Sequence, residues 1–309
     1  MKISGLAPSL LKPSAIAQPS CSRAGGMLEK NAVDTTYHGL LVCPQDRMTT
    51  LQLVPKTAPS HLRDYCFGLG KNFEGRATPS DVACAWRERA GDGFEESLKS
   101  LFGGTPLTCK NANVSAFLRD GKLESLDFDM RLQAKGCGDR AGTMARSFEF
   151  THPDGPTVYH SYFSLAPEFQ DAGIAKRILG NSLELYDRLG IERVSLTAGL
   201  EVGGYAWARY GFKPESKESL RELQDEVRWN LDQLGVSTRT HSLVSRLLDS
   251  DDPKSVWTLS DLDMMVTGYD GGRMKLGKAL LMGTAWDGEL DLKDDESRER
   301  FQQYVSHAQ

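Results

Sequence analysis

The stretch from residue 114 to residue 165 constrains the fold more than any other part of this chain. It holds four apolar segments of strand length, separated by turn signals such as Asp120-Gly121 and Asp154-Gly155. Turn residues at this spacing favour hairpins, in which consecutive strands run antiparallel. We therefore predict an antiparallel meander formed by VSAFLR (114–119), LESLDFDMRL (123–132), ARSFEFTH (145–152) and TVYHSYFSL (157–165).

The fourth segment leads into FQDAGIAKRIL (169–179), in which Gly173 stands ahead of a helical pattern. Apolar residues recur at helical spacing until Gly190, a residue type that often closes a helix. Helices usually carry glycine at their C-terminal side, so Gly173 needs another explanation. A glycine at a helix N-terminus lets a ligand approach the backbone, where free N–H groups and the helix dipole favour an anion. The segment therefore predicts an anion-binding turn.

Two further segments complete the pattern. RVSLTA (193–198) reads as a short strand, and GGYAWARYGF (203–212) reads as a second helical piece. A dinucleotide-binding fold does not fit, because the G-x-G-x-x-G fingerprint is absent and hairpins rather than helices join the strands before Gly173. A P-loop around Lys71 does not fit either, since no Ser or Thr follows that lysine.

With these alternatives weighed, LAPEFQDAGIA (165–175) resembles the acetyl-CoA motif of the GNAT superfamily of N-acetyltransferases: a proline, an acidic residue, an aromatic residue and then Q-x-x-G-x-A. RVSLTA and the terminal YGF (210–212) fall where that family places its fifth strand and the close of its next helix. The resemblance covers about residues 114–214. It implies an α+β, GNAT-like fold: a mixed, mostly antiparallel central sheet flanked by helices, with a helical C-terminal extension. It also implies acetyl-CoA-dependent transfer of an acetyl group to an amine.

The resemblance further implies how acetyl-CoA, the cosubstrate, is held. In the family, main-chain N–H groups at the helix start wrap the diphosphate, and the end of the preceding strand pairs with the pantetheine arm. Arg273, Lys275 and Lys278 are candidate contacts of the 3′-phosphate, although basic loops are often simply solvated. The resemblance implies that acetyl-CoA is bound by the following residues: Phe163, Leu165, Ala166, Gln170, Asp171, Ala172, Gly173, Ile174, Ala175 and Lys176.

The sequence departs from the family pattern in two places. Asp171 and Ala172 replace the small or basic residues common in this loop, which puts a carboxylate beside an anionic ligand; Asp171 could instead cap the helix. Trp207 occupies the position where the family often has a tyrosine that acts as general acid. Both departures leave open an alternative: a GNAT-fold module that binds acetyl-CoA or a partner without catalysis.

Four residues are candidates for proton transfer. His160 could act as a general base, and on simple alternation it shares one strand face with Tyr162 and Ser164. Glu201 follows the fifth strand, close to where an amine would enter, and could act through water. Both residues also have a purely structural interpretation: His160 could be a hydrogen-bonded histidine of a half-buried strand, and Glu201 could be a solvated loop carboxylate. Tyr205 and Tyr210 could protonate the leaving thiolate or could simply be core residues.

Composition narrows the partners. The chain has 309 residues of which 39% are apolar, enough for a sizeable core. Its formal net charge of −5 argues weakly against nucleic acid, and no apolar run approaches the roughly 18 residues of a membrane span. The six cysteines are widely spaced with no C-x-x-C pair, so we expect no zinc site.

The regions flanking the core are less informative. Residues 1–28 lack acidic residues and are rich in Ser, Pro, Ala and Gly, which predicts a disordered tail dispensable for folding. The same composition fits a type III secretion signal of a bacterial effector, cytoplasmic in the producing cell and acting on a host protein. Residues 29–105 form a region of uncertain structure, with a helix near 80–102 broken around Gly91 and Gly93.

We place the acyltransferase core at residues 106–215 and a mainly helical extension at 216–309. In the extension, Ser219 with Glu222 fits a capping box, and Gly235 can close the helix that follows. KALLMGTAWDGELDL (278–292) could add a strand, and residues 294–305 read as a final amphipathic helix.

Overall fold

A twisted β-sheet organises the described part of the chain, which in this computed structural model comprises residues 49–53, 79–199, 203–269 and 271–306. All of them belong to the larger of the two units into which the chain divides, Gln45–Gln309. The predicted tail at residues 1–28 and Glu201 lie outside the described residues.

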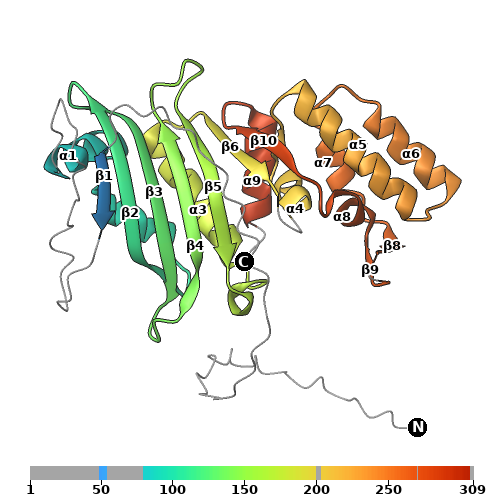
Figure 1. The fold of residues 1–309 in the computed structure, drawn as a ribbon, viewed down its shortest axis with the longest axis horizontal. Coiled ribbons are helices and arrows are strands. Elements are labelled where there is room, and N and C mark those ends of the chain that lie inside the picture. The colour runs from blue at the N-terminus through green and yellow to red at the C-terminus, as the bar shows by residue number, and fades with distance from the viewer. Residues whose placement is uncertain (1–48, 54–78, 200–202, 270, 307–309) are drawn as a thin grey trace, which may run out of the picture. The chain divides into compact units, whose positions relative to one another are not determined.

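The sheet has the strand order β1-β2-β3-β4-β5-β6-β10-β7 among the described residues (Figure 1). Every neighbouring pair is antiparallel except β5 and β6, which run parallel. The predicted meander is confirmed as β2 to β5. The strands are β1 (Thr49–Leu53), β2 (Leu107–Arg119), β3 (Lys122–Ala134), β4 (Arg140–Glu149), β5 (Thr157–Leu165), β6 (Arg193–Ala198), β7 (Lys213–Pro214) and β10 (Trp286–Asp291).

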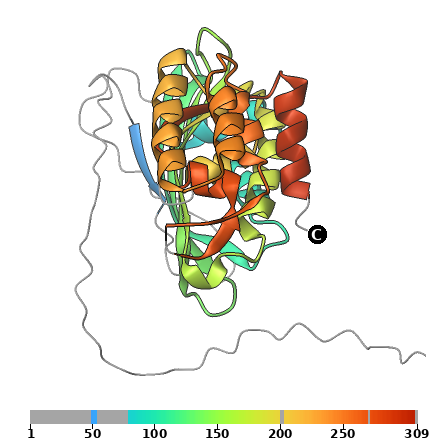
Figure 2. The same cartoon turned by 90° about the vertical axis from the view of Figure 1, so that its right-hand side faces the viewer.

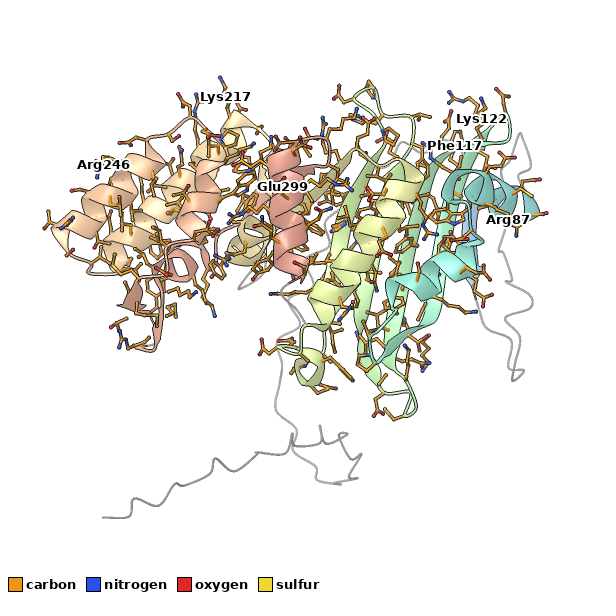
Figure 3. The ribbon with its side chains drawn as sticks, turned by 180° about the vertical axis from the view of Figure 1, so that it is seen from behind. Arg87, Phe117, Lys122, Lys217, Arg246 and Glu299 are labelled. Atoms are coloured by element: carbon orange, nitrogen blue, oxygen red, sulfur yellow. The ribbon has the colours of Figure 1, made fainter. Side chains whose placement is uncertain are left out.

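Alternation along the strands gives the sheet one apolar face. In β3, Phe128, Met130 and Leu132 are buried while Asp129 and Arg131 between them are exposed. The buried face is covered by α1 (Pro79–Ala90), α2 (Phe94–Leu101) and α3 (Ile174–Leu189), which lie in front of the sheet when it is seen from behind (Figure 3). The predicted fold class, a mixed and mostly antiparallel sheet flanked by helices, is confirmed.

Phe148 lies at the centre of the core beneath these helices. Its ring is 1% exposed and its centroid lies 6.2 Å from that of Trp86 on α1 and 6.1 Å from that of Tyr186 on α3. Phe128 and Phe150 lie 5.6 and 5.9 Å away on the sheet side. This aromatic cluster therefore joins the sheet to α1 and α3, two of the helices that cover it.

A helical segment lies between β7 and β10 in the sequence and faces the viewer in Figure 2. The predicted helical C-terminal part is confirmed. The prediction that Ser219 caps its first helix is wrong. The cap is Ser216, whose hydroxyl accepts from the Ser219 N–H, and Gly235 follows the helix with φ +58°. The segment contains α5 (Lys217–Gln233), α6 (Thr238–Leu248), α7 (Ser255–Ser260), the β8–β9 hairpin (Met265–Thr267 and Arg273–Lys275) and α8 (Leu276–Leu281).

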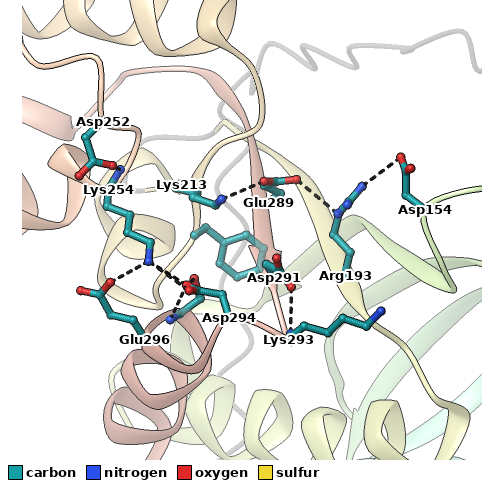
Figure 4. A network of polar contacts seen from close by, with 12 residues as sticks. Asp154, Arg193, Lys213, Asp252, Lys254, Glu289, Asp291, Lys293, Asp294 and Glu296 are labelled. Carbon is teal, nitrogen blue, oxygen red and sulfur yellow. Dashed lines mark hydrogen bonds and ion pairs between the residues drawn. The ribbon is translucent and has the colours of Figure 1, made fainter.

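After this segment the chain returns to the sheet. β10 pairs with β6 from Trp286↔Ala198 to Asp291↔Arg193, and β7 lies on its other side. Ion pairs follow the same order: Glu289 on β10 contacts Arg193 on β6 at 3.4 Å and Lys213 on β7 at 3.1 Å (Figure 4). The domain boundary placed at residue 215 stays a prediction, and strands from both sides of it share one sheet.

The final helix, α9 (Asp295–Ser306), begins at a capping carboxylate. Asp294 accepts from the Ser297 N–H at 3.0 Å. It also accepts from Lys254 Nζ at 2.9 Å (Figure 4). The Ser297 and Lys254 contacts lower the pKa of Asp294 from 3.8 to about 2. The helix also packs beside α3. None of the described helices is long and apolar enough to cross a membrane.

Replacing Asp294 with alanine should lower the free energy of unfolding by about 1 kcal/mol at pH 7, because the α9 cap and the ion pair with Lys254 are both lost. Since the pKa of this carboxyl is depressed in the folded state, its stabilisation is present above about pH 4 and is lost as pH falls toward 2. Urea unfolding of the parent and of the alanine variant at pH 7 and pH 2.5 measures this. An Asp294→Asn control keeps a capping oxygen, and an equal loss for Asp294→Ala at both pH values would contradict the prediction.

Candidate functional site

The parallel pair β5 and β6 separates before β5 ends. Pairing runs from Thr157↔Arg193 to His160↔Leu196, whereas β5 continues to Leu165 alongside β4. Figure 1 shows β5 extending past its parallel neighbour. Residues 161–165 therefore have a strand on the β4 side and no described strand on the β6 side.

A β-bulge lies where the two strands separate. Ala145 pairs with Tyr162 and Ser147 pairs with Tyr159, so the two residues 160 and 161 of β5 lie opposite the single residue Arg146 of β4. The extra residue reverses which face each later side chain takes. The predicted alternation of His160 and Tyr162 on one face is therefore wrong: His160 is 6% exposed and Tyr162 is 47% exposed.

Beyond the bulge, the main chain of β5 presents an open edge. The Ala166 N–H donates to the Ala141 carbonyl at 2.9 Å, and the Tyr162 carbonyl accepts from Arg146 on the same side. Because main-chain groups alternate along a strand, the N–H and C=O groups of Phe163 and Leu165 point away from β4. The Leu165 carbonyl accepts from the Gln170 side chain at 2.8 Å. Within the described part of the chain, the Phe163 N–H and C=O and the Leu165 N–H are then left without a main-chain or side-chain partner.

The loop after β5 ends in two left-handed residues. A short 3-10 turn, Pro167–Phe169, is followed by Asp171 with φ +58° and by Gly173 with φ +71°. Gly173 is the N-cap of α3 and no side chain caps this helix, so Asp171 is not the cap. The first helical hydrogen bond runs from the Arg177 N–H to the Gly173 carbonyl. The N–H groups of the first turn are thus left without helical acceptors and converge at the loop.

Side chains beside the loop include cations. Lys176 and Arg177 line a groove between α3 and α9 that begins at the first turn of α3. Lys176 Nζ lies 4.1 Å from the centre of the Tyr304 ring on α9. By contrast, the predicted phosphate contacts Arg273 and Lys275 lie on the β8–β9 hairpin, far from α3 in both Figures 1 and 3.

The structure buries the His160 side chain between the sheet and α3, so it is not exposed to solvent. Its Nε2 lies 2.7 Å from the hydroxyl of Tyr186 on α3. Burial, and secondarily the charge of Arg146, lower the pKa of His160 well below its usual value. The imidazole is therefore neutral at pH 7, and its position matches a structural histidine better than a base that faces an incoming amine.

The predicted tyrosines belong to α4 (Gly203–Arg209) and to the turn after it. Tyr210 is 7% exposed, and its ring centroid lies 4.6 Å from that of Tyr304; burial raises its pKa. Tyr205 is half-buried, and desolvation raises its pKa too, so both phenols are protonated at neutral pH. Trp207 packs against His160, with ring centroids 6.0 Å apart.

Two residues of this region were not identified from the sequence. Arg146 on β4 and Tyr186 on α3 lie against His160 beneath the bulge. The sequence did contain a signal for Arg146. It is spaced by two residues from both Met144 and Phe148, so all three side chains lie on the buried face of β4. The described residues contain no group of three or more His, Cys, Asp or Glu that could hold a metal ion.

Comparison with known proteins gives only distant likenesses, all among solved structures. No protein-family model matches this chain. No curated protein matches it either. Among solved structures, the chain is similar to a GNAT family acetyltransferase from Elizabethkingia anophelis with acetyl-CoA bound: identity is 13%, the TM-score is 0.22, and the likeness covers 56% of this chain and 80% of that one. A likeness this distant supports no conclusion about function.

Proposed function

We propose that this chain is an acetyl-CoA-dependent N-acetyltransferase of the GNAT type. One observation carries the proposal: the open edge of β5 is followed, after the short loop of residues 166–173, by the uncapped first turn of α3. A strand edge offers hydrogen bonds to an extended amide chain, and a helix N-terminus offers N–H groups to phosphate oxygens. Acetyl-CoA carries both groups in this order, with the pantetheine amides next to the diphosphate.

In this proposal the diphosphate lies on the N–H groups from Gly173 to Lys176. The left-handed Gly173 turns the backbone toward the ligand, and Lys176 and Arg177 beside the groove favour the remaining phosphate. The pantetheine amides pair with the Phe163 C=O and the Leu165 N–H. The thioester then reaches the bulge, where β5 and β6 separate.

The reaction itself needs few groups. The amine attacks the thioester carbonyl directly, a C–N bond forms, and the C–S bond breaks. A backbone N–H on β5 stabilises the oxyanion, and the thiolate of CoA takes a proton from a phenol or from water. Glu201 remains our proposed base, acting through water. A protein lysine or N-terminus, a polyamine and a small metabolite are all chemically possible acceptors, and the flanking regions favour a protein.

A binding module without catalysis is the second candidate. Trp207 in place of a proton-donating tyrosine and a neutral, buried His160 both favour it. Calorimetry with acetyl-CoA, followed by CoA-thiol release with spermidine, a lysine peptide and free N-terminal peptides, separates the two. Release above the rate without amine supports the enzyme, and tight binding without release supports the module. A chain that does not bind acetyl-CoA at all would refute the enzyme and the acetyl-CoA-binding module, and would leave a module that binds a partner.

Replacing Glu201 with glutamine should lower turnover at pH 7 by at least about tenfold with little change in acetyl-CoA affinity, because a positioned base contributes about 10²- to 10⁴-fold. High pH should partly restore the rate as free amine becomes available. His160→Gln should have the smaller effect, and Glu222→Gln on the exposed face of α5 is the matched control. Unaltered turnover of Glu201→Gln between pH 6 and 9 would assign the base elsewhere.

A further inference from the structure

Arg146 combines deep burial with missing partners. Its side chain is 2% exposed, and its Nε and Nη2 have no partner in good hydrogen-bond geometry among the described residues. The polar side chain that interacts with the guanidinium is the hydroxyl of Tyr186 on α3, which is not a counter-ion at neutral pH. No carboxylate in the described part of the chain pairs with it. A buried charge without a counter-ion costs free energy, and an apolar side chain of similar volume avoids that cost. Simple packing therefore gives no reason for a guanidinium at this position.

The remaining nitrogen of the guanidinium has a defined task. Nη1 donates to the Ala145 carbonyl at 2.7 Å and to the Tyr162 carbonyl at 3.0 Å. One of these carbonyls belongs to β4 and the other to β5, at the bulge where the ladder between the two strands shifts register. A single nitrogen thus holds both strands at the point where β5 leaves β6.

Holding the Tyr162 carbonyl also orients the next amide. In a planar trans peptide the C=O and N–H groups point in opposite directions. With the Tyr162 carbonyl held toward Arg146, the N–H of Phe163 points away from β4, to the side where no described strand pairs with residues 161–165. The Phe163 ring lies on the same guanidinium, its centroid 5.8 Å from Arg146 Cζ. Arg146 therefore restrains residue 163 through its backbone and its side chain.

We propose that Arg146 is a positioning residue for acyl transfer: it fixes the peptide between Tyr162 and Phe163 so that the Phe163 N–H donates to the thioester carbonyl of acetyl-CoA. This rests on the proposed function. As the amine attacks, the carbonyl electron pair moves onto oxygen, which the same N–H stabilises. The pair returns when the C–S bond breaks and the thiolate leaves. Arg146 gains or loses no proton and forms no bond to the substrate in this sequence.

Arg146→Met tests the role, with Arg89→Met as the matched control. Arg89 lies on another element, α1, and is partly buried. Like Arg146, it has an Nε without an acceptor among the described residues, and its guanidinium lies 4.2 Å from the centre of the Phe150 ring. Calorimetry with acetyl-CoA and with CoA, and infrared spectra of [1-¹³C]acetyl-CoA, give the readouts. The parent should bind acetyl-CoA with a lowered carbonyl frequency.

In Arg146→Met the carbonyl shift should disappear, and the preference for acetyl-CoA over CoA should fall about three- to tenfold, as for one hydrogen bond. CoA affinity should stay within about twofold of the parent, which a general loss of structure would not allow. Arg89→Met should match the parent in every readout. Arg146→Lys, which keeps one positively charged donating nitrogen, should restore part of the shift.

The outcomes separate this role from the function on which it rests. A parent that does not bind acetyl-CoA refutes the proposed function itself. A parent that binds it, with an Arg146→Met variant that retains the carbonyl shift, overturns the role of Arg146 alone. Should both Arg146 variants fail to fold, the Phe163 amide resonance of the parent decides: it should move downfield with acetyl-CoA and not with CoA, and an equal response to both ligands overturns the proposal.

Discussion

Replacing Gly173 with glutamate is expected to weaken acetyl-CoA binding about a hundredfold, a loss of about 2.7 kcal/mol. Two effects add in the same direction. Gly173 has φ +71°, a conformation that costs other residues about 1 kcal/mol or more, and the new carboxylate would stand beside the diphosphate at the first turn of α3. Calorimetry with acetyl-CoA measures the change.

The opposite end of the same helix supplies the control. Gly190 is the C-cap of α3 with φ +67°, and a Cβ added there meets nothing within 4 Å. Gly173→Ala and Gly190→Ala therefore impose similar backbone strain, and both should lower the melting temperature by a few degrees. Only the change at Gly173 should weaken binding. Equal affinity of Gly173→Glu and the parent would remove the diphosphate site from the proposal.

Truncating Phe148 to alanine should lower the free energy of unfolding by about 3–5 kcal/mol, which is the range for deleting a buried aromatic ring and leaving a cavity. The effect should be this large because Phe148 is 1% exposed and contacts rings from both the sheet and the covering helices. Urea unfolding followed by circular dichroism gives the value.

Trp229 is the control for that measurement. It is also a large aromatic residue, yet it lies on α5 and is 64% exposed, so Trp229→Ala should change stability by no more than about 0.5 kcal/mol. A loss below about 1 kcal/mol for Phe148→Ala would mean that the core collapses around the gap. The aromatic cluster would then not be what joins helix and sheet.

Much of the fold could be predicted from the sequence because its signals are local. Turn dipeptides such as Asp120-Gly121 defined the hairpins, and helical spacing up to Gly190 defined α3. Gly173 marked the turn whose left-handed backbone the structure contains. Each of these signals acts over a few residues, through backbone conformation and side-chain periodicity, so a single sequence carries them.

The tertiary structure decided what depends on strands far apart in the sequence. The bulge at residues 160 and 161 arises only from the pairing of β5 with β4. Because of this bulge, the His160 side chain is buried against the helices and the Tyr162 side chain is exposed to solvent. Strand β10 lies between β6 and β7 in the sheet, although a mainly helical segment of about seventy residues separates it from β7 in the sequence. No local pattern specifies this pairing. The sequence by itself determined the turn and the helix on which the proposed diphosphate site rests. The buried partners around the bulge, Arg146 and Tyr186, came together only through long-range packing, because their contacts are set by which strand and helix lie beside β5.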